Sequence, residues 1–245
     1  MNVLLKGALV SFSPTFIPIP IPNIIVFQYN PETMTHTWTQ PEAATAGAGT
    51  TPSQGTSTNN PMAVQGMPGE SFSFSIAVDA NDEIADGSAP TAAIALVSGV
   101  YSRLAAIEML LYPTTPGGGG LLGAVSAAAA NLAGGDSSGP TTQVPASTMP
   151  VVLFIWGPGR IVPVRVTGLT TTEKLYNGTL SPTHADAQLS LRVLTPAELA
   201  WAGKDDDPMA SLASMAYTYT QALREALALA NLANAAESII GMIPH

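Results

Sequence analysis

NIIVFQYNPETMTHTW, residues 23–38, is the stretch that decides how this sequence folds. Its first part consists of β-branched and aromatic residues, which suit a half-buried strand, and Asn30-Pro31 then gives a common turn signal. Met-Thr-His-Thr-Trp follows the turn at once and continues as extended chain. The stretch therefore predicts two short strands on either side of a turn, and such a unit is either a structural corner or a docking surface.

Further strands are predicted from alternation and from short apolar runs. Residues 70–80, ESFSFSIAVDA, alternate apolar residues with serine and alanine, which indicates a strand with one buried face. Residues 151–169 contain an apolar run, a Gly-Pro-Gly turn and a second run, which predicts a β-hairpin. Strands are also expected at residues 4–12 and 186–195. The proline-alternating residues 14–23 fit only an extended connector or a sheet edge, because proline removes hydrogen-bond donors from the ladder.

Two long helices are predicted. Apolar residues recur at steps of three and four between Pro90 and Leu111, and Pro113 follows, so this segment should form one amphipathic helix that covers a sheet. A second helix is expected to begin at Pro208, with Asp207 as its N-cap. This second helix carries an apolar stripe that either docks on a partner or packs on the chain's own sheet. The stripe consists of Leu212, Met215, Tyr219, Leu223 and Leu227.

Two segments lack any sustained periodicity. Residues 40–65 are polar, small and rich in residues that break helices and strands, which is typical of a long mobile loop. Residues 116–146 look like a flexible insertion, with at most one helical turn around residues 127–130. No core residues are expected in the first of these segments.

The composition excludes several functional classes. The 245-residue chain has a net charge of −9 and only 8 lysine and arginine residues, too few to neutralise a row of phosphates, so nucleic acid is not a predicted partner. No apolar stretch reaches the ~20 residues of a spanning helix, so no direct membrane insertion is expected. The absence of cysteine rules out disulfides and thiolate metal ligands, which suits the cytoplasm. Only 10% of the residues are charged, so either partners cover much of the surface or the composition has drifted towards alanine and glycine.

Residues for catalysis or metal binding are not evident. None of the three histidines has a second ligand at a metal-binding spacing, and His36 is best explained as a packing residue of its strand. No serine lies in a nucleophile elbow, and the glycines at 117–120 lack the Lys-Ser or Lys-Thr of a phosphate loop. Capping and solvation explain the acidic groups Asp79/Asp82 and 205–207 more simply than acid–base chemistry or calcium binding. No catalytic residue, cofactor or metal is therefore predicted, and an assembly protein is favoured over an enzyme.

Five blocks of sequence, taken in order, resemble a known family. The blocks are LLKGALVSFSP (4–14), PNIIVFQYNPETMTHTW (22–38), PGESFSFSIAVDANDE (68–83), AAIEMLLYP (105–113) and VVLFIWGPGRIVPVRVTGLTTTEKLYNGTLSPTHADAQLSLRVL (151–194). Together they resemble the tube-like domain of baseplate hub or tube-initiator proteins in phage-tail-like contractile injection systems. The resemblance runs through most of residues 1–200 and is interrupted by the two segments without periodicity.

The resemblance implies a mainly β fold with flanking helices (α+β), in the form of a tail-tube-like antiparallel β-barrel or sandwich with one side helix. Residues 1–200 would form this tube-like β domain, and residues 201–245 a C-terminal helical extension where many relatives carry a lysin-motif domain instead. Such a chain is a non-enzymatic subunit of a homohexameric ring between the spike hub and the inner tube. Its partners are copies of itself, the spike or hub protein, the inner tube protein and other baseplate components.

Two other functions stay open beside this one. The chain is alternatively a polymerising inner-tube or tube-cap protein of the same particle, or an unrelated β-domain binding module. For the injection-system functions, the expected location is the cytoplasm, where the particle assembles before it is released or docks at a membrane.

The candidate interface residues come from two signature segments and from the second strand of the opening stretch. Within FQYNPE and FIWG the resemblance implies structural or interface roles. The candidates are Phe27, Tyr29, Asn30, Pro31, Glu32, Trp38, Phe154 and Trp156. On this interpretation the turn at Asn30-Pro31 redirects the chain, so that the strand after it extends the sheet or joins a neighbouring subunit.

Overall fold

The computed structural model describes residues 5–13, 21–41, 66–86, 95–112, 150–202 and 208–240. Nearly all of the predicted loop 40–65 and the whole of the predicted insertion 116–146 lie outside these residues. The predicted N-cap Asp207 also lies outside them, whereas Pro208 is the first residue of its helix, as expected.

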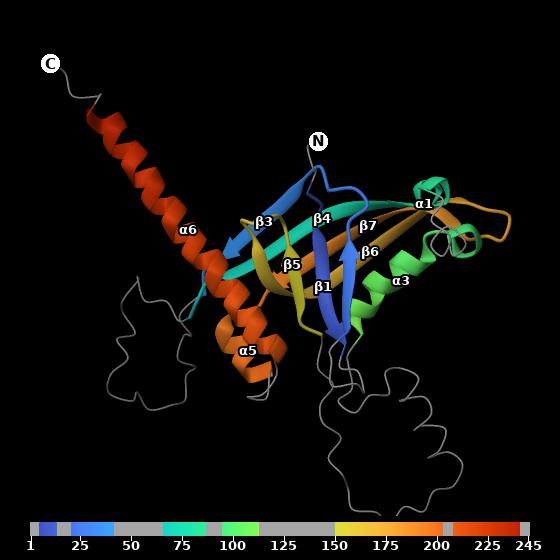
Figure 1. Ribbon diagram of the computed structural model, residues 1–245, viewed down its shortest axis with the longest axis horizontal. Coiled ribbons are helices and arrows are strands. Elements are labelled where there is room, and N and C mark those ends of the chain that lie inside the picture. The colour runs from blue at the N-terminus through green and yellow to red at the C-terminus, as the bar shows by residue number, and fades with distance from the viewer. Residues whose placement is uncertain are drawn as a thin grey trace, which may run out of the picture.

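Seven strands form one antiparallel sheet with a few flanking helices, which confirms the mainly β, α+β class. The strands are β1 (Ala8–Ser13), β2 (Ile21–Val26), β3 (Met34–Thr39), β4 (Gly69–Asp79), β5 (Val152–Ile155), β6 (Ile161–Tyr176) and β7 (Pro182–Val193). Their order across the sheet is β2-β1-β5-β6-β7-β4-β3. In Figure 1, β1, β2 and β5 run across β4, β6 and β7, so the sheet curls around its own core.

The described strands form an open sheet, so the antiparallel β architecture is confirmed, and the finer expectation of a tail-tube-like barrel or sandwich stays a prediction. Within the described residues β2 pairs with β1 alone and β3 pairs with β4 alone. The two outer strands do not pair with each other, so within the described residues each of them has a strand partner on one side only. β2 contains Pro22, which agrees with the prediction that the proline-rich segment fits a sheet edge.

The opening stretch links these two edges. Its first strand is β2 and its second is β3, and residues 27–33 cross from one edge of the sheet to the other. In a flat sheet the outer two of seven strands would stand roughly 29 Å apart, which residues 27–33 could span only if fully extended. The segment instead bends at Gln28, Tyr29 and Glu32, so the sheet must curl to bring its edges closer.

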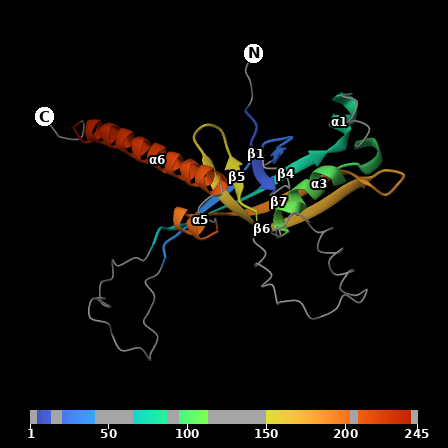
Figure 2. The same ribbon diagram turned by 60° about the horizontal axis from the view of Figure 1, so that its bottom comes forward.

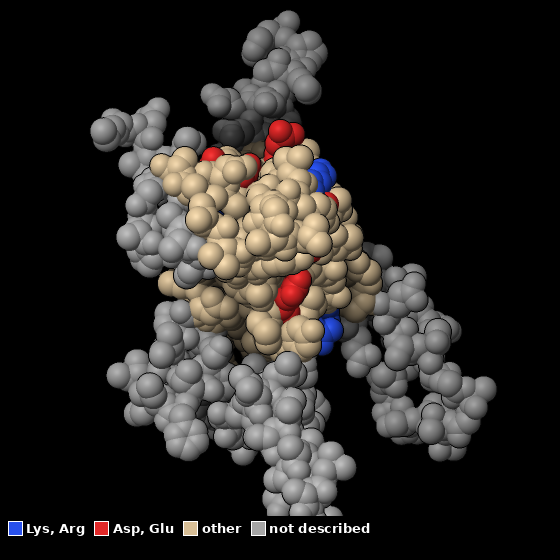
Figure 3. All heavy atoms as spheres, turned by 90° about the vertical axis from the view of Figure 1, so that its right-hand side faces the viewer, with Lys and Arg blue, Asp and Glu red and all other residues tan. Residues whose placement is uncertain are grey.

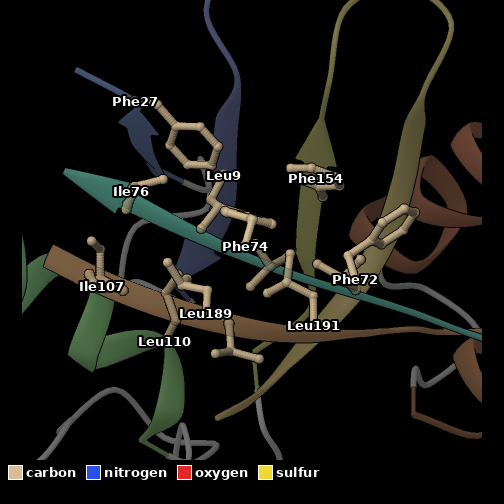
Figure 4. Packing of buried hydrophobic residues seen from close by; sticks show 14 of the residues in the cluster. Leu9, Phe27, Phe72, Phe74, Ile76, Ile107, Leu110, Phe154, Leu189 and Leu191 are labelled. Carbon is tan, nitrogen blue, oxygen red and sulfur yellow. The ribbon is translucent and has the colours of Figure 1, made fainter. Parts of the chain in front are cut away.

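The core lies on the inner face of the curled sheet. The alternation predicted for β4 is confirmed, because Phe72, Phe74, Ile76 and Val78 are all buried. Figure 4 shows the packing of Phe72, Phe74 and Ile76 against residues from the other strands and from the flanking helix. An aromatic cluster at the centre includes Phe154, whose ring stacks on that of Phe74 with centroids 5.5 Å apart. These apolar contacts hold the two halves of the sheet together.

The helix predicted for residues 90–111 is broken in two. A helical turn at residues 95–98 ends at Gly99, whose φ of +57° no continuing helix can adopt, and α3 (Tyr101–Glu108) with the 3-10 turn η1 (Met109–Leu111) follows. The break changes which residues are buried, so Val97 and Tyr101, which belong to the apolar residues expected on one face of the predicted helix, are exposed. The core residues of this region are Ala95, Val100, Leu104, Ile107 and Leu110. The predicted role of covering the sheet is confirmed for α3, in which Leu104 and Ile107 are buried.

The β6–β7 hairpin is longer than the sequence patterns indicated. β6 continues to Tyr176 and β7 begins at Pro182, so the hairpin extends well beyond the part predicted from apolar runs. Asn177 organises the turn, because its side-chain Oδ1 accepts hydrogen bonds from the backbone amides of Thr179 (3.0 Å) and Ser181 (2.9 Å). Asn177-Gly178 is a recognised hairpin signal that would have predicted this turn.

Two short helices were not predicted. α1 (Ala80–Asp86) follows β4 directly, and α5 (Pro196–Ala202) follows β7. Thr195 and Glu198 form a capping box at the start of α5: the Thr195 amide donates to Glu198 Oε2 (2.9 Å), and the Glu198 amide donates to Thr195 Oγ1 (3.4 Å). The Thr-Pro-Ala-Glu sequence is the signature of such a box and would have identified α5.

The last helix, α6 (Pro208–Ile240), extends beyond the rest of the molecule. It packs on β6 and on α5 through its first half, and every residue from Glu225 to Leu232 is exposed. Figures 1 and 2 show from two directions that its second half projects away from the sheet.

Candidate interaction surfaces

The acidic pair Asp79 and Asp82 has structural partners. Asp79 Oδ1 accepts a hydrogen bond from the amide of Asn81 (2.8 Å) at the start of α1, which is the predicted capping role. Asp82 Oδ2 accepts hydrogen bonds from the Tyr29 hydroxyl and from Gln28 Nε2 (3.2 Å), so it holds the segment that joins the sheet edges. In the part of the chain that the structure describes, no three histidine or acidic residues are grouped as a metal site requires.

Two amide side chains fix the crossing segment 27–33 in place. Gln28 pairs with the backbone of Asp79 in both directions: its Oε1 accepts from the Asp79 amide, and its Nε2 donates to the Asp79 carbonyl, both at 2.9 Å. Asn30 does the same for the N-terminal residues, because its Oδ1 accepts from the Gly7 amide and its Nδ2 donates to the Leu5 carbonyl, again at 2.9 Å. Each side chain therefore replaces a missing strand partner, and the segment is a structural corner.

The predicted candidates in this corner and in the β5 signature separate into buried and exposed residues. Phe27 and Phe154 are 1% and 0% exposed, so of their two predicted roles they have the structural one and cannot contact a neighbour directly. Trp156 is half-buried, with its ring 6.1 Å from that of Phe154. Tyr29 is 45% exposed. Asn30 and Glu32 are also exposed, and Pro31 is half-buried.

A cluster of charged and aromatic side chains fastens α6 to the sheet. Glu70 of β4 is 4% exposed and binds Arg224 of α6 through two bonds, Nη1 to Oε2 at 3.0 Å and Nη2 to Oε1 at 2.5 Å. The His36 Nε2 lies 2.7 Å from Glu70 Oε1, and the imidazole stacks on Phe72. The Arg224 guanidinium also lies over the ring of Trp38, 4.7 Å from its centroid. His36 is thus the packing residue that was predicted, but the sequence patterns did not indicate the ion pair that it joins.

The burial of His36 makes this cluster sensitive to acid. Burial lowers the pKa of His36 below its usual 6.5, outweighing the nearby Glu70 carboxylate, which raises it. The unfolded chain, with the usual pKa, therefore takes up a proton first as the pH falls. We expect the free energy of unfolding to decrease as the pH drops below 6.5 and through the folded-state pKa of His36. Urea unfolding across this pH range should show a smaller decrease for His36→Gln, and identical pH profiles would contradict the expectation.

The apolar stripe predicted on the second helix does not pack on the sheet. α6 contacts the body through other residues: Ala213, Tyr217 and Thr220 are buried, and the Thr220 hydroxyl donates to the Ile161 carbonyl (2.7 Å). Leu223 of the predicted stripe is half-buried. The exposed members of the stripe are Leu212 (43%), Met215 (66%), Tyr219 (49%) and Leu227 (61%). α6 therefore packs on the chain's own sheet, as one of the two predicted alternatives has it, but mainly through a face beside the predicted stripe.

The two edges of the sheet are uncharged and partly apolar. On β2 the side chains of Ile24 and Val26 are 56% and 48% exposed, and on β3 Trp38 is 46% exposed. Neither edge strand contains Lys, Arg, Asp or Glu. Charged residues on edge strands are a common protection against pairing with other chains, and in both strands that protection is missing.

A comparison of the sequence with protein-family models and with curated proteins found no match. Among the helices of the described residues, none is both long enough and apolar enough to cross a membrane. The sheet edges and the exposed stripe of α6, together with the sequence resemblance, are the features from which a function can be argued.

Proposed function

We propose that the chain is a non-enzymatic subunit of a homohexameric ring that joins the baseplate and spike hub to the inner tube of a contractile injection particle. One observation carries the proposal: in the part of the chain that the structure describes, the sheet ends in two unlike strands, β2 and β3, each paired on one side only. A closed ring needs two different, complementary surfaces on each copy, because its contacts are head to tail. Pairing of β2 in one copy with β3 in the next meets this requirement.

The shape of the sheet supports the finer, tail-tube-like part of the proposal. The sheet is curled, antiparallel and open, and a helix covers its flank. Pairing of edge strands around a ring would join six such sheets into one continuous barrel and remove every free edge. The uncharged, partly apolar edge strands fit burial in this contact better than lasting exposure to solvent.

The proposed partners follow from a position between the hub and the tube. They are copies of the chain itself, the spike or hub protein, the inner tube protein and other baseplate components. The particle assembles in the cytoplasm and is then released or docks at a membrane. The role needs neither a catalytic group nor a cofactor.

A polymerising inner-tube or tube-cap protein of the same particle is the second candidate. The exposed stripe of α6 favours it, because this stripe offers the chain a contact outside the sheet edges. A tube protein would form long stacks alone, whereas an adaptor would stop at single rings. An unrelated binding module would stay monomeric.

Electron microscopy and mass measurement of the purified chain test the ring. We expect rings of six 25.1 kDa copies for the wild type. Lysines at Ile24 and Val26 should abolish the rings, because both side chains are exposed at the β2 edge and a charge there opposes strand pairing. The matched control is Thr170→Lys with Thr172→Lys, since both residues are exposed on the central strand β6. A monomeric wild type, or equal loss of rings in both variants without unfolding, would refute edge pairing.

A further inference from the structure

Two exposed apolar surfaces lie at opposite ends of the molecule. The first, called the outer stripe, is on α6, which projects at the left of Figure 1. It consists of Met215, Tyr219, Ala222, Ala226 and Leu229. The second, called the tip surface, surrounds the turn of the β6–β7 hairpin at the right of the same view. It consists of Leu96, Val97, Tyr101, Leu175, Tyr176 and Leu180.

The tip surface is a connected structure and not a set of scattered side chains. The Val100 amide donates to the carbonyl of Pro182 (2.9 Å), and the Ser181 hydroxyl donates to the carbonyl of Val97 (3.4 Å), so the helical turn 95–98 is attached to the hairpin. Every member of the tip surface is between 43% and 77% exposed. Figure 3 looks onto this end of the molecule, and its described surface is interrupted by only a few acidic and basic side chains.

Two leucines of the tip surface have an unfavourable backbone conformation. Leu175 and Leu180 have φ angles of +55° and +60°, a left-handed conformation that costs a residue other than glycine about 1–2 kcal/mol. Their side chains are 70% and 77% exposed, so side-chain packing within the chain does little to offset this cost, and backbone hydrogen bonds such as that from the Leu180 amide to the Asn177 carbonyl (3.0 Å) hold the turn. Glycine or asparagine would adopt the same conformation more easily. A contact with another molecule would account for leucine at both positions.

The outer stripe has the spacing of a helix face that packs on a partner. Its members follow one another at steps of four, three, four and three residues and cover roughly 21 Å of helix. Met215 and Leu229 are 66% and 68% exposed, and no charged residue belongs to the stripe. Tyr219 is held in position because its hydroxyl donates to the carbonyl of Pro158 (3.0 Å). The side of α6 that faces the sheet carries Ala213, Tyr217, Thr220 and Arg224 instead.

We propose that the outer stripe of one copy docks on the tip surface of a second copy. The two surfaces cannot meet within one molecule, because they lie at opposite ends of it in both views. With six members that are each 43–77% exposed, the tip surface presents on the order of several hundred Å² of apolar area. This is below the ~800 Å² per partner of a standard interface, so the docking should be weak and depend on concentration. Because the surfaces differ from each other, the contact is head to tail, as a ring requires. The inference rests on the proposed self-assembly and adds a contact separate from edge pairing.

The test separates this contact from the edge contact by starting from the Ile24→Lys, Val26→Lys variant. In this background we expect sedimentation over a concentration series to show association, because both proposed docking surfaces are intact. Adding Leu175→Glu with Leu180→Glu, or Met215→Glu with Leu229→Glu, should weaken this association at least tenfold and leave monomers. An equal mixture of these two variants should form dimers, since each retains the surface that the other has lost. Thr170→Glu with Thr172→Glu on β6 is the matched control, and circular dichroism reports folding.

Each other outcome decides between the two proposals. A starting variant that is monomeric at every concentration, or a mixture that stays monomeric, overturns the docking. Because the chain has no cysteine, Leu229→Cys and Leu180→Cys in separate copies should crosslink to each other, and crosslinking of Leu229→Cys only with itself would also overturn it. Rings that survive the glutamate substitutions in a chain with intact edges support edge pairing as the contact that closes the ring. Association through the tip surface without rings in the wild type supports the docking and refutes the ring.

Discussion

Glu70→Ala is expected to lower the free energy of unfolding by about 3 kcal/mol and to loosen α6 from the sheet. Glu70 is almost fully buried and is the shared partner of Arg224 and His36. Without the carboxylate, the Arg224 guanidinium would stand against the sheet with no other ion-pair partner among the described residues. This decrease in the free energy of unfolding is at the lower end of the range for removing one partner of a buried ion pair. The reason is that the Arg224 side chain is 27% exposed and can turn towards water.

A double-mutant cycle checks the physical cause. Urea unfolding of Glu70→Ala, Arg224→Ala and the double variant should give a combined loss smaller than the sum of the single losses, because either substitution already breaks the pair. Hydrogen exchange should rise in the first half of α6 for each of them. Glu225→Ala, at the next and exposed position of the helix, is the matched control. A loss below about 1 kcal/mol for Glu70→Ala would show that the ion pair does not secure the helix.

Gly99→Ala should destabilise the protein by about 3 kcal/mol, through left-handed strain and overpacking together. Gly99 has a φ of +57°, and a Cβ at this position would lie 2.1 Å from the carbonyl oxygen of Pro182. Because that oxygen belongs to the backbone of β7, it cannot move aside like a flexible side chain. The helical turn 95–98 would have to separate from the hairpin, and the hydrogen bond from Val100 to Pro182 would be lost.

Gly157→Ala separates these two causes. Gly157 also has a positive φ, +68°, but a Cβ there would meet nothing within 4 Å. Gly157→Ala should therefore lower the free energy of unfolding by about 1 kcal/mol, which is the contribution of the left-handed backbone strain alone. Thermal and urea unfolding of the two alanine variants give the comparison. Equal losses would mean that the close approach to Pro182 does not matter.

The strands could be predicted from the sequence because their signal is local. In β4 every second residue faces the core, so the alternation of apolar and polar residues around Phe72 and Phe74 can be recognised from the sequence. Which strands become neighbours is decided by contacts between distant parts of the chain. Nothing within residues 23–38 indicates that β2 and β3 form opposite edges of one sheet.

The packing face of α6 could not be predicted from hydrophobicity. Alanine and leucine occur around most of this helix, and the residues that meet the sheet include Thr220 and Arg224, which are polar. The face is selected by specific bonds, such as that from Thr220 to Ile161. Glu70 and Arg224 are 154 positions apart, so no spacing rule connects them.

In the proposed ring of a contractile particle, the corner 27–33 would have a mechanical consequence. A single covalent stretch joins β2 to β3, and these strands are otherwise separated by five intervening strands. Tension that enters at one of them can travel along peptide bonds to the other, without shearing the ladder between them. The hydrogen bonds that Gln28 and Asn30 make to the backbone hold residues 27–33 in place. A force passed around a ring would therefore be carried by the covalent chain as well as by hydrogen bonds between strands.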